Sequence, residues 1–387
     1  MRALLLAWFM LAWPASGNAV EAQFGGFVTQ GFIKTDRNNY FGPSTTGSFD
    51  FREIGVSAAL DFGDRVRLST LLLSRIAGNT ARGEPQFDHA VVDLKLSDSA
   101  TSRTGILAGR VKLPIGLFNE TRDVASTRPS ILLPQSIYYD NARKYLINAD
   151  GLILYHEIYG ENSVTRITAK AMESTGINNV ESETYFLGAN FPGSIGSGTA
   201  YGLRVLHETD GGKTRLAAYA ATNPVKYTPG SADILSSGDI KIKVLWLSAH
   251  REIGKWGFTA ETMLPQLKYS NFGPVISDRT TYPMGLYGAV SYRSDSNWEA
   301  FARYDVTYID RNDKSGAALS AATGKPAHAF FAKDVTIGGR YHFTPKTSLS
   351  AELHIVDGTA WVPIVDNPAG ATDRYWKLFA LQLTHSF

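Results

Sequence analysis

Cysteine is absent from this 387-residue chain, so the fold contains no disulfide and no metal held by thiolates. The charge is nearly balanced, at +2 with neutral histidines, which excludes the broad basic field of a nucleic-acid-binding protein. After the amino-terminal segment, no apolar run approaches the roughly 20 residues that a membrane-spanning helix needs. The sequence also lacks G-x-S-x-G, H-E-x-x-H, P-loop and dinucleotide-binding motifs. These absences predict no cofactor, no metal and no nucleic-acid partner.

The amino-terminal segment MRALLLAWFMLAWPASGNAVEA carries one early positive charge, Arg2, followed by an apolar run from Ala3 to Trp13. Pro14 breaks this run, and small residues follow it. This is the layout of a secretory signal peptide, because the run is shorter than the roughly 20 residues of a spanning helix. We therefore predict a cleaved signal peptide over residues 1–22, with cleavage after Ala19 or Ala22, and a single β domain over residues 23–387.

Alternating apolar and polar residues dominate the rest of the chain, as in WEAFARYDVTYID (residues 298–310). Such alternation indicates β-strands with one apolar and one polar face. Seven junctions between these segments are short and rich in turn-forming residues, which is typical of hairpins. Eight junctions are longer, and they lie near residues 36–48, 77–88, 112–150, 173–197, 223–237, 270–281, 311–332 and 358–373. These fifteen connections predict sixteen antiparallel strands.

The short and long junctions alternate strictly, so all the long ones fall on one side of the sheet. This asymmetry and the even strand number are the pattern of a bacterial outer-membrane β-barrel. We assign TYFLGANF (residues 184–191) to a loop, because a seventeenth strand would break the alternation. A sheet in hydrocarbon has no free edges, so the first strand, Phe24 to Thr35, is expected to pair with the last, Arg374 to Phe387. Phe387 would then lie on the lipid-facing side, within an aromatic girdle.

These features resemble the Gram-negative porins, sixteen-stranded outer-membrane channels that commonly assemble as trimers. The resemblance covers the whole mature chain, and the terminal strand ending in Phe387 is similar to the signal that the barrel-assembly machinery recognises. A shorter stretch, GRVKLPIGLFNETRD (residues 109–123), resembles porins of the phosphate-selective type. The resemblance implies an outer-membrane protein surrounded by lipid that lets small polar or anionic solutes diffuse passively. It also suggests a homotrimer, the assembly common in the family. It also implies that the third long loop folds into the barrel and narrows it.

Two sets of charged residues are the candidate pore-lining sites. The first lies on the third long loop, residues 112–150: Glu120, Arg122, Asp123, Arg128, Asp140, Arg143 and Lys144. The second is assigned to the inner wall from side-chain parity: Arg110, Lys112, Arg166, Lys170, Lys241, Lys243, Arg303 and Arg340. Basic residues outnumber acidic ones such as Glu53, Glu261 and Glu352 on the predicted inner face. Because rings of arginine and lysine favour anions, we predict a mild anion preference.

Two other kinds of function are weighed against the channel. One is a barrel enzyme, such as a lipid hydrolase, which needs a nucleophile, a base and an oxyanion site close together. The eight histidines are scattered and none pairs with another at metal-ligand spacing, so an enzyme is not expected. The other is a plugged barrel that serves in binding or adhesion, which conductance measurements would distinguish from a channel.

Overall fold

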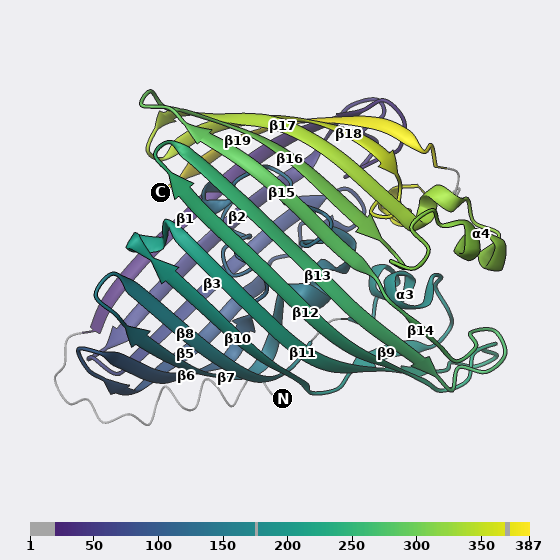
Figure 1. Ribbon diagram of the computed structural model, residues 1–387, viewed down its shortest axis with the longest axis horizontal. Coiled ribbons are helices and arrows are strands. Elements are labelled where there is room, and N and C mark those ends of the chain that lie inside the picture. The colour runs from purple at the N-terminus through teal and green to yellow at the C-terminus, as the bar shows by residue number, and fades with distance from the viewer. Residues whose placement is uncertain (1–19, 175–176, 368–371) are drawn as a thin grey trace.

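The computed structural model describes residues 20–174, 177–367 and 372–387. In these residues one antiparallel sheet of sixteen long strands closes into a barrel (Figure 1), which confirms the predicted fold class. The strands are β1 (Val20–Thr35), β2 (Ser48–Phe62), β3 (Val66–Ala77), β5 (Gln86–Asp98), β6 (Ser102–Lys112), β7 (Asn148–Tyr159), β8 (Ser163–Glu173), β10 (Ala200–Thr209), β11 (Thr214–Thr228), β12 (Gly238–Ile253), β13 (Trp256–Ser270), β15 (Met284–Arg293), β16 (Trp298–Tyr308), β17 (Phe331–Thr344), β18 (Thr347–Gly358) and β19 (Tyr375–Ser386).

Three short strands extend the barrel at its long-loop end. They are β4 (Ala81–Arg82), β9 (Ser194–Ser197) and β14 (Arg279–Thr281), which pair with β3, β11 and β13. The segment 184–191, assigned to a loop from the alternation of junctions, contains no strand: helix α3 (Val180–Leu187) covers its first half, and the next strand begins at Ser194. The other helices are α2 (Arg143–Leu146) and α4 (Ala317–Thr323). Among the described residues, no helix has the length and apolarity needed to cross a bilayer.

The barrel closes where its first and last strands meet. β1 pairs with β19 in continuous register from Phe27 opposite Ser386 to Thr35 opposite Leu378. The backbone N–H of Phe387 donates to the carbonyl of Gly26 at 2.9 Å, and Gly26 returns a bond of 3.1 Å. The predicted pairing of the first and last strands is therefore present, and it leaves the sheet without a free edge, as hydrocarbon requires. The first nineteen residues of the predicted signal peptide lie outside the described part of the chain.

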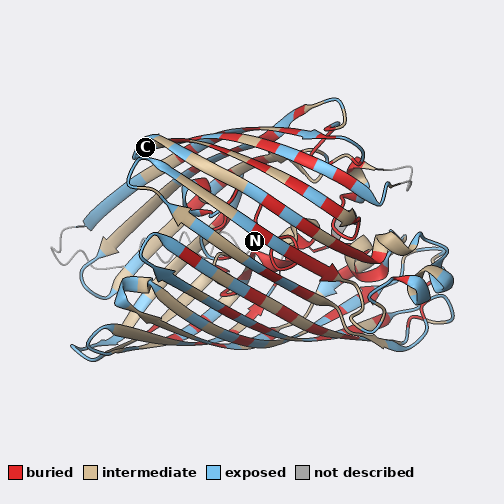
Figure 2. Cartoon of the chain, turned by 45° about the horizontal axis from the view of Figure 1, so that its top comes forward, coloured by how far each residue is buried: buried red, intermediate tan, exposed pale blue. Residues whose placement is uncertain are grey.

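Exposed and buried residues alternate along the strands, as Figure 2 shows. On β16 and β17 the outward side chains are apolar, and Tyr304 and Ile337 are each about half exposed. The inward neighbours Arg303 and Asp305 are almost completely buried inside the barrel. An outer surface of this kind suits hydrocarbon, whereas the charged inner face must find partners within the barrel.

The strand β12 has the opposite orientation to the one predicted from its alternation. Ile242 and Trp246 point inward and are 7% and 4% exposed. Lys241 and Lys243 therefore lie on the outer face, together with Leu245. The prediction that these two lysines line the lumen is wrong, because the interior beside β12 is filled by apolar side chains of the long loops. Here the apolar face of the strand packs inside, and the lysines lie near the long-loop end of the outer surface.

Candidate functional site: the loop that crosses the barrel

The third long connection, residues 113–147 and called L3 below, lies inside the barrel. Its backbone donates hydrogen bonds to wall carboxylates on separate strands, from Ser136 to Asp305 on β16 at 3.2 Å and from Leu132 to Glu352 on β18 at 2.8 Å. On the other side of the barrel, Arg204 of β10 donates to the carbonyl of Gly116 in L3 at 2.9 Å. Because these strands are far apart around the wall, the loop crosses the interior.

Glu261 on β13 is the most heavily bonded of the wall carboxylates that hold L3. It is 1% exposed and accepts bonds from two L3 groups, the N–H of Leu117 at 2.9 Å and the hydroxyl of Tyr138 at 2.7 Å. Two wall hydroxyls, those of Ser248 and Tyr287, donate to it at 2.6 Å each. A buried carboxylate is tolerable only with such donors, so the loop and the wall depend on each other at this point.

His354 on β18 lies beneath L3, where it is shielded from water. It is 1% exposed, with Nδ1 2.6 Å from Asp334 and Nε2 3.1 Å from Glu352. Glu352 in turn accepts the backbone N–H groups of Ile131 and Leu132. The histidine therefore belongs to the polar support on which the loop rests.

Four arginines surround a narrow space beside L3, and we call them the arginine cluster: Arg75 of β3 with Arg122, Arg128 and Arg143 of the loop. The space holds only about 10 Å³. Three carboxylates form ion pairs with the cluster. Glu53 lies 2.5 Å from Arg128 and 3.3 Å from Arg75. Asp140 lies 3.2 Å from Arg75 and 3.5 Å from Arg122, and Asp123 pairs with Arg143. The guanidinium groups thus outnumber the carboxylates that they contact directly.

The cluster is short of acceptors. Among the described residues, neither Nη1 of Arg122 nor Nε of Arg128 has a hydrogen-bond partner, although both atoms are buried. Burial lowers the pKa of Arg122 and of Arg143, and the neighbouring Arg75 adds to the effect in each case. An anion among these side chains would supply the missing acceptors and offset the repulsion between the cations.

Five of the seven loop residues singled out in the sequence lie together in this network: Arg122, Asp123, Arg128, Asp140 and Arg143. Glu120 lies apart from them and pairs with Arg204 of the wall at 2.7 Å. Lys144 is exposed on α2. At the base of the loop, Lys112 is buried and forms ion pairs with Asp123 and with Asp88 of β5.

Besides Lys112, four of the wall residues singled out in the sequence face the interior. Arg303 donates to the Leu132 carbonyl of L3 at 3.0 Å, and Arg340 donates to the Arg128 carbonyl at 2.6 Å. Arg166 lies 3.6 Å from Glu157, and Lys170 lines an apolar cavity. Sequence reasoning overlooked Arg75 and Asp88. Arg75 could have been found from side-chain parity, because it alternates with the apolar Leu72 and Ile76 along its strand.

Arg110 is a further correction, because it does not line the lumen. It forms two bonds with Asp150 of β7, of 2.8 and 3.1 Å. Asp150 shares its face of β7 with the exposed Leu152. Ala149 and Ile153 belong to the opposite face of the strand and are buried inside. The pair therefore lies on the outer surface, where each charge neutralises the other. With Arg110, Lys241 and Lys243 outside, the surplus of basic residues on the inner wall is smaller than predicted.

The closed barrel of sixteen strands is the fold of solved outer-membrane porins. No protein-family model matches the chain, and no curated protein sequence matches it. Solved structures match it over nearly its whole length. OmpT of Vibrio cholerae in its trimer form shares 11% identity over 96% of this chain and 100% of its own, with a TM-score of 0.58.

Two further structures are similar. The outer-membrane channel DcaP of Acinetobacter baumannii shares 12% identity over 96% of this chain and 99% of its own, with a TM-score of 0.58. The anion-selective porin of Comamonas acidovorans shares 14% identity over 95% of this chain and 100% of its own, with a TM-score of 0.53. At such identities the likeness establishes the fold, and the chemistry must be argued from this chain's own residues.

Proposed function

We propose that the protein is an outer-membrane channel through which small polar solutes diffuse passively, with a mild preference for anions and a constriction formed by residues 112–150. The observation that carries the proposal is the arginine cluster on a loop that crosses the barrel. Basic side chains at a narrow point raise the local concentration of anions and lower that of cations. The similarity to an anion-selective porin agrees with this preference.

The region between L3 and the short turns supports a water-filled passage. Inward charged side chains near the short turns keep substantial exposure, at 44% for Arg67, 33% for Arg166 and 72% for Arg293. Their partners Asp61, Glu157 and Glu299 lie at the same level. Both signs of charge are present there, so selectivity is assigned to the arginine cluster and not to this vestibule.

Single-channel recording in planar bilayers tests the proposal. We expect stable conductance steps, a reversal potential in a KCl gradient that indicates anion preference, and a shift toward cations when Arg122 is replaced by glutamine. Deleting about twenty residues around 120–140 should enlarge the conductance, because the loop no longer crosses the interior. Cation preference in the wild type would contradict the selectivity, and unchanged conductance after the deletion would remove L3 as the constriction.

A plugged barrel that binds a partner is the second candidate. One observation favours it: most of L3 is buried, and the space within the arginine cluster is only about 10 Å³. In that case the wild-type barrel would show no conductance steps, and the loop deletion would open it. The same recordings therefore separate the two functions.

Export, assembly and oligomeric state complete the proposal. Cleavage of the signal peptide after Ala19 would keep the pairing of Val20 with Phe62, whereas cleavage after Ala22 would remove it; amino-terminal sequencing of the membrane form distinguishes the two. Phe387, which is 61% exposed on the outer face, is proposed as the feature that the barrel-assembly machinery binds. A homotrimer, as in the trimer form of OmpT, is testable by sedimentation in detergent.

A further inference from the structure

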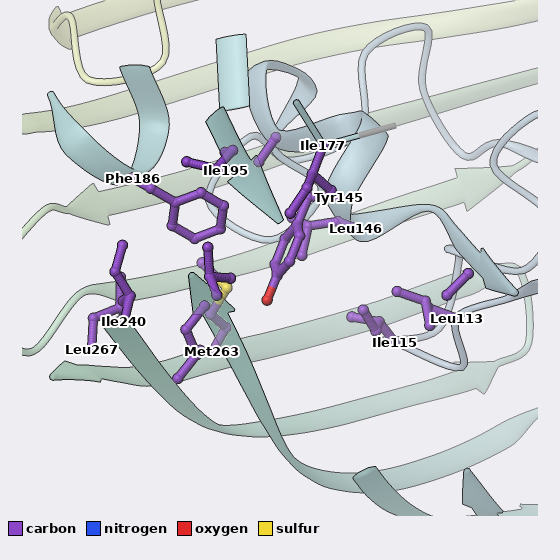
Figure 3. Close-up of a cluster of buried hydrophobic side chains, with 14 of the residues drawn as sticks. Leu113, Ile115, Tyr145, Leu146, Ile177, Phe186, Ile195, Ile240, Met263 and Leu267 are labelled. Atoms are coloured by element: carbon purple, nitrogen blue, oxygen red, sulfur yellow. The ribbon is translucent and has the colours of Figure 1, made fainter. Parts of the chain in front are cut away.

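A second cavity lies inside the barrel, away from the arginine cluster. It holds about 60 Å³ and is lined by the base of L3, by α3 and by the inner faces of β8 and β10–β13. Figure 3 shows Tyr145 and Leu146 of L3, Phe186 of α3, and Met263 and Leu267 of β13 gathered around this part of the interior. The lining is aliphatic and aromatic, so the cavity suits an apolar molecule.

One charged side chain, that of Lys170 on β8, lines this apolar cavity. Lys170 is 8% exposed, and no hydrogen bond or ion pair joins it to any residue in the described part of the chain. Its ammonium lies 5.2 Å from the centre of the Tyr219 ring, which is a cation–π contact. A buried ammonium without a counter-ion is costly. The wall residues nearest to it in the sheet, Ile153 and Gly202, offer no carboxylate.

The local backbone makes room for this lysine. Gly202 lies directly opposite Lys170 on β10. A Cβ at this position would come within 2.9 Å of Lys170 Cε and 3.0 Å of the Tyr219 hydroxyl. The glycine thus lets the aliphatic part of Lys170 lie against the wall beside Tyr219.

Other unused donors lie beside Lys170. Trp246 packs against Tyr219 with ring centres 5.7 Å apart, and its indole N–H is buried with no acceptor among the described residues. The hydroxyl of Tyr219 likewise has no partner within the residues that the structure covers. The indole nitrogen has no exposed surface toward the cavity, so the unused donors that face it are the Lys170 ammonium and the Tyr219 hydroxyl, side by side opposite Gly202. Buried donors are normally satisfied, and a ligand that supplies acceptor oxygens would satisfy these.

We infer that this cavity binds a small monocarboxylate with an apolar body, its carboxylate at Lys170 and the Tyr219 hydroxyl and its ring or alkyl group among Tyr145, Phe186 and Met263. A single cation favours a single negative charge, and the two oxygens of a carboxylate match the Lys170 ammonium and the Tyr219 hydroxyl. The apolar lining disfavours a compact, strongly hydrated anion such as phosphate, which would lose its water without equivalent partners. This inference rests on the proposed function, because it names the solutes that the interior would retain.

Binding of sodium benzoate to the purified barrel in detergent, measured by calorimetry, tests the inference. We expect saturable binding of benzoate and of cyclohexanecarboxylate, and much weaker binding of acetate, inorganic phosphate and the neutral isostere benzamide. Replacing Lys170 by methionine should weaken benzoate binding roughly ten- to a hundredfold, as expected for the loss of a charge-assisted bond. Lys170→Arg should stay within a few-fold of the wild type. Lys241→Met on the outer face is the matched control and should bind as the wild type does.

Heat-modifiable migration on gels checks that every variant is folded. Benzoate binding that is absent in the wild type, unchanged by Lys170→Met, or equalled by benzamide would overturn the inference. KCl conductance measured on the same preparations keeps the two proposals apart. A conducting barrel that does not bind benzoate contradicts only this inference, whereas a benzoate-binding barrel that never conducts contradicts only the channel.

Discussion

Replacing Glu261 by leucine should release L3 from the wall at β13. The substitution removes a buried carboxylate that accepts bonds from Leu117 and Tyr138 of the loop and from Ser248 and Tyr287 of the wall. Each orphaned buried donor costs about 1–3 kcal/mol. Of the two loop donors, the N–H of Leu117 keeps a second acceptor, the Tyr138 hydroxyl at 2.9 Å. Only the Tyr138 hydroxyl is orphaned, so the attachment of the loop weakens by about 1–3 kcal/mol. This is enough for the free segment to populate detached states that the wild type almost never visits.

Planar-bilayer recording measures the effect directly. We expect a larger mean conductance and more open-channel noise in Glu261→Leu, together with faster proteolysis within L3. The matched control is Glu299→Leu, because Glu299 also faces the interior but contacts Arg293 and His342 instead of the loop. If Glu261→Leu folds and its conductance, noise and cleavage equal those of Glu299→Leu, the reasoning that wall carboxylates hold the loop is refuted.

Two further predictions concern α3 and the carboxyl terminus. Burial raises the pKa of Glu183 in α3. A carboxyl group whose pKa is raised by burial stabilises the packed state while it is protonated. The amide hydrogens of α3 should therefore exchange faster as the pH rises through the range where Glu183 ionises. This pH dependence, corrected for intrinsic exchange, should vanish in Glu183→Gln, and its persistence there would assign it to another group. Deleting Phe387 removes its two backbone bonds with Gly26 and should lower the yield of heat-modifiable barrel in membranes several-fold, whereas Phe387→Tyr should assemble normally; equal yields for both variants would contradict a role for the terminal aromatic residue.

The strand number could be predicted from the sequence because it depends on local chemistry. Turn residues and alternation are encoded within a few positions, so sixteen strands and the pairing of β1 with β19 follow from the pattern. Which face of a strand points inward depends on distant residues. On β12 the apolar residues pack against L3 and α3, so parity alone assigned Lys241 and Lys243 to the wrong side.

The partners of the charged residues were equally hard to predict. The sequence places Arg122 and Arg143 on a long loop. Arg75 instead belongs to strand β3 and contacts Asp140 of the loop, 65 positions away in the chain. Arg110 similarly finds Asp150 on the neighbouring strand, 40 positions away. Periodicity identifies which residues are charged and on which element they lie, whereas their contacts are set by how the loop folds inside the barrel.

The position of Arg128 links L3 to the seam of the barrel. Its guanidinium donates to Glu53 of β2 at 2.5 Å and to Gln382 of β19 at 3.5 Å, and these two strands flank β1 on either side. Arg128 can make both contacts at once only when β1 brings β2 and β19 together, that is, in the closed barrel. One loop side chain thus clamps the two strands on either side of the seam, so opening the seam would also loosen the loop.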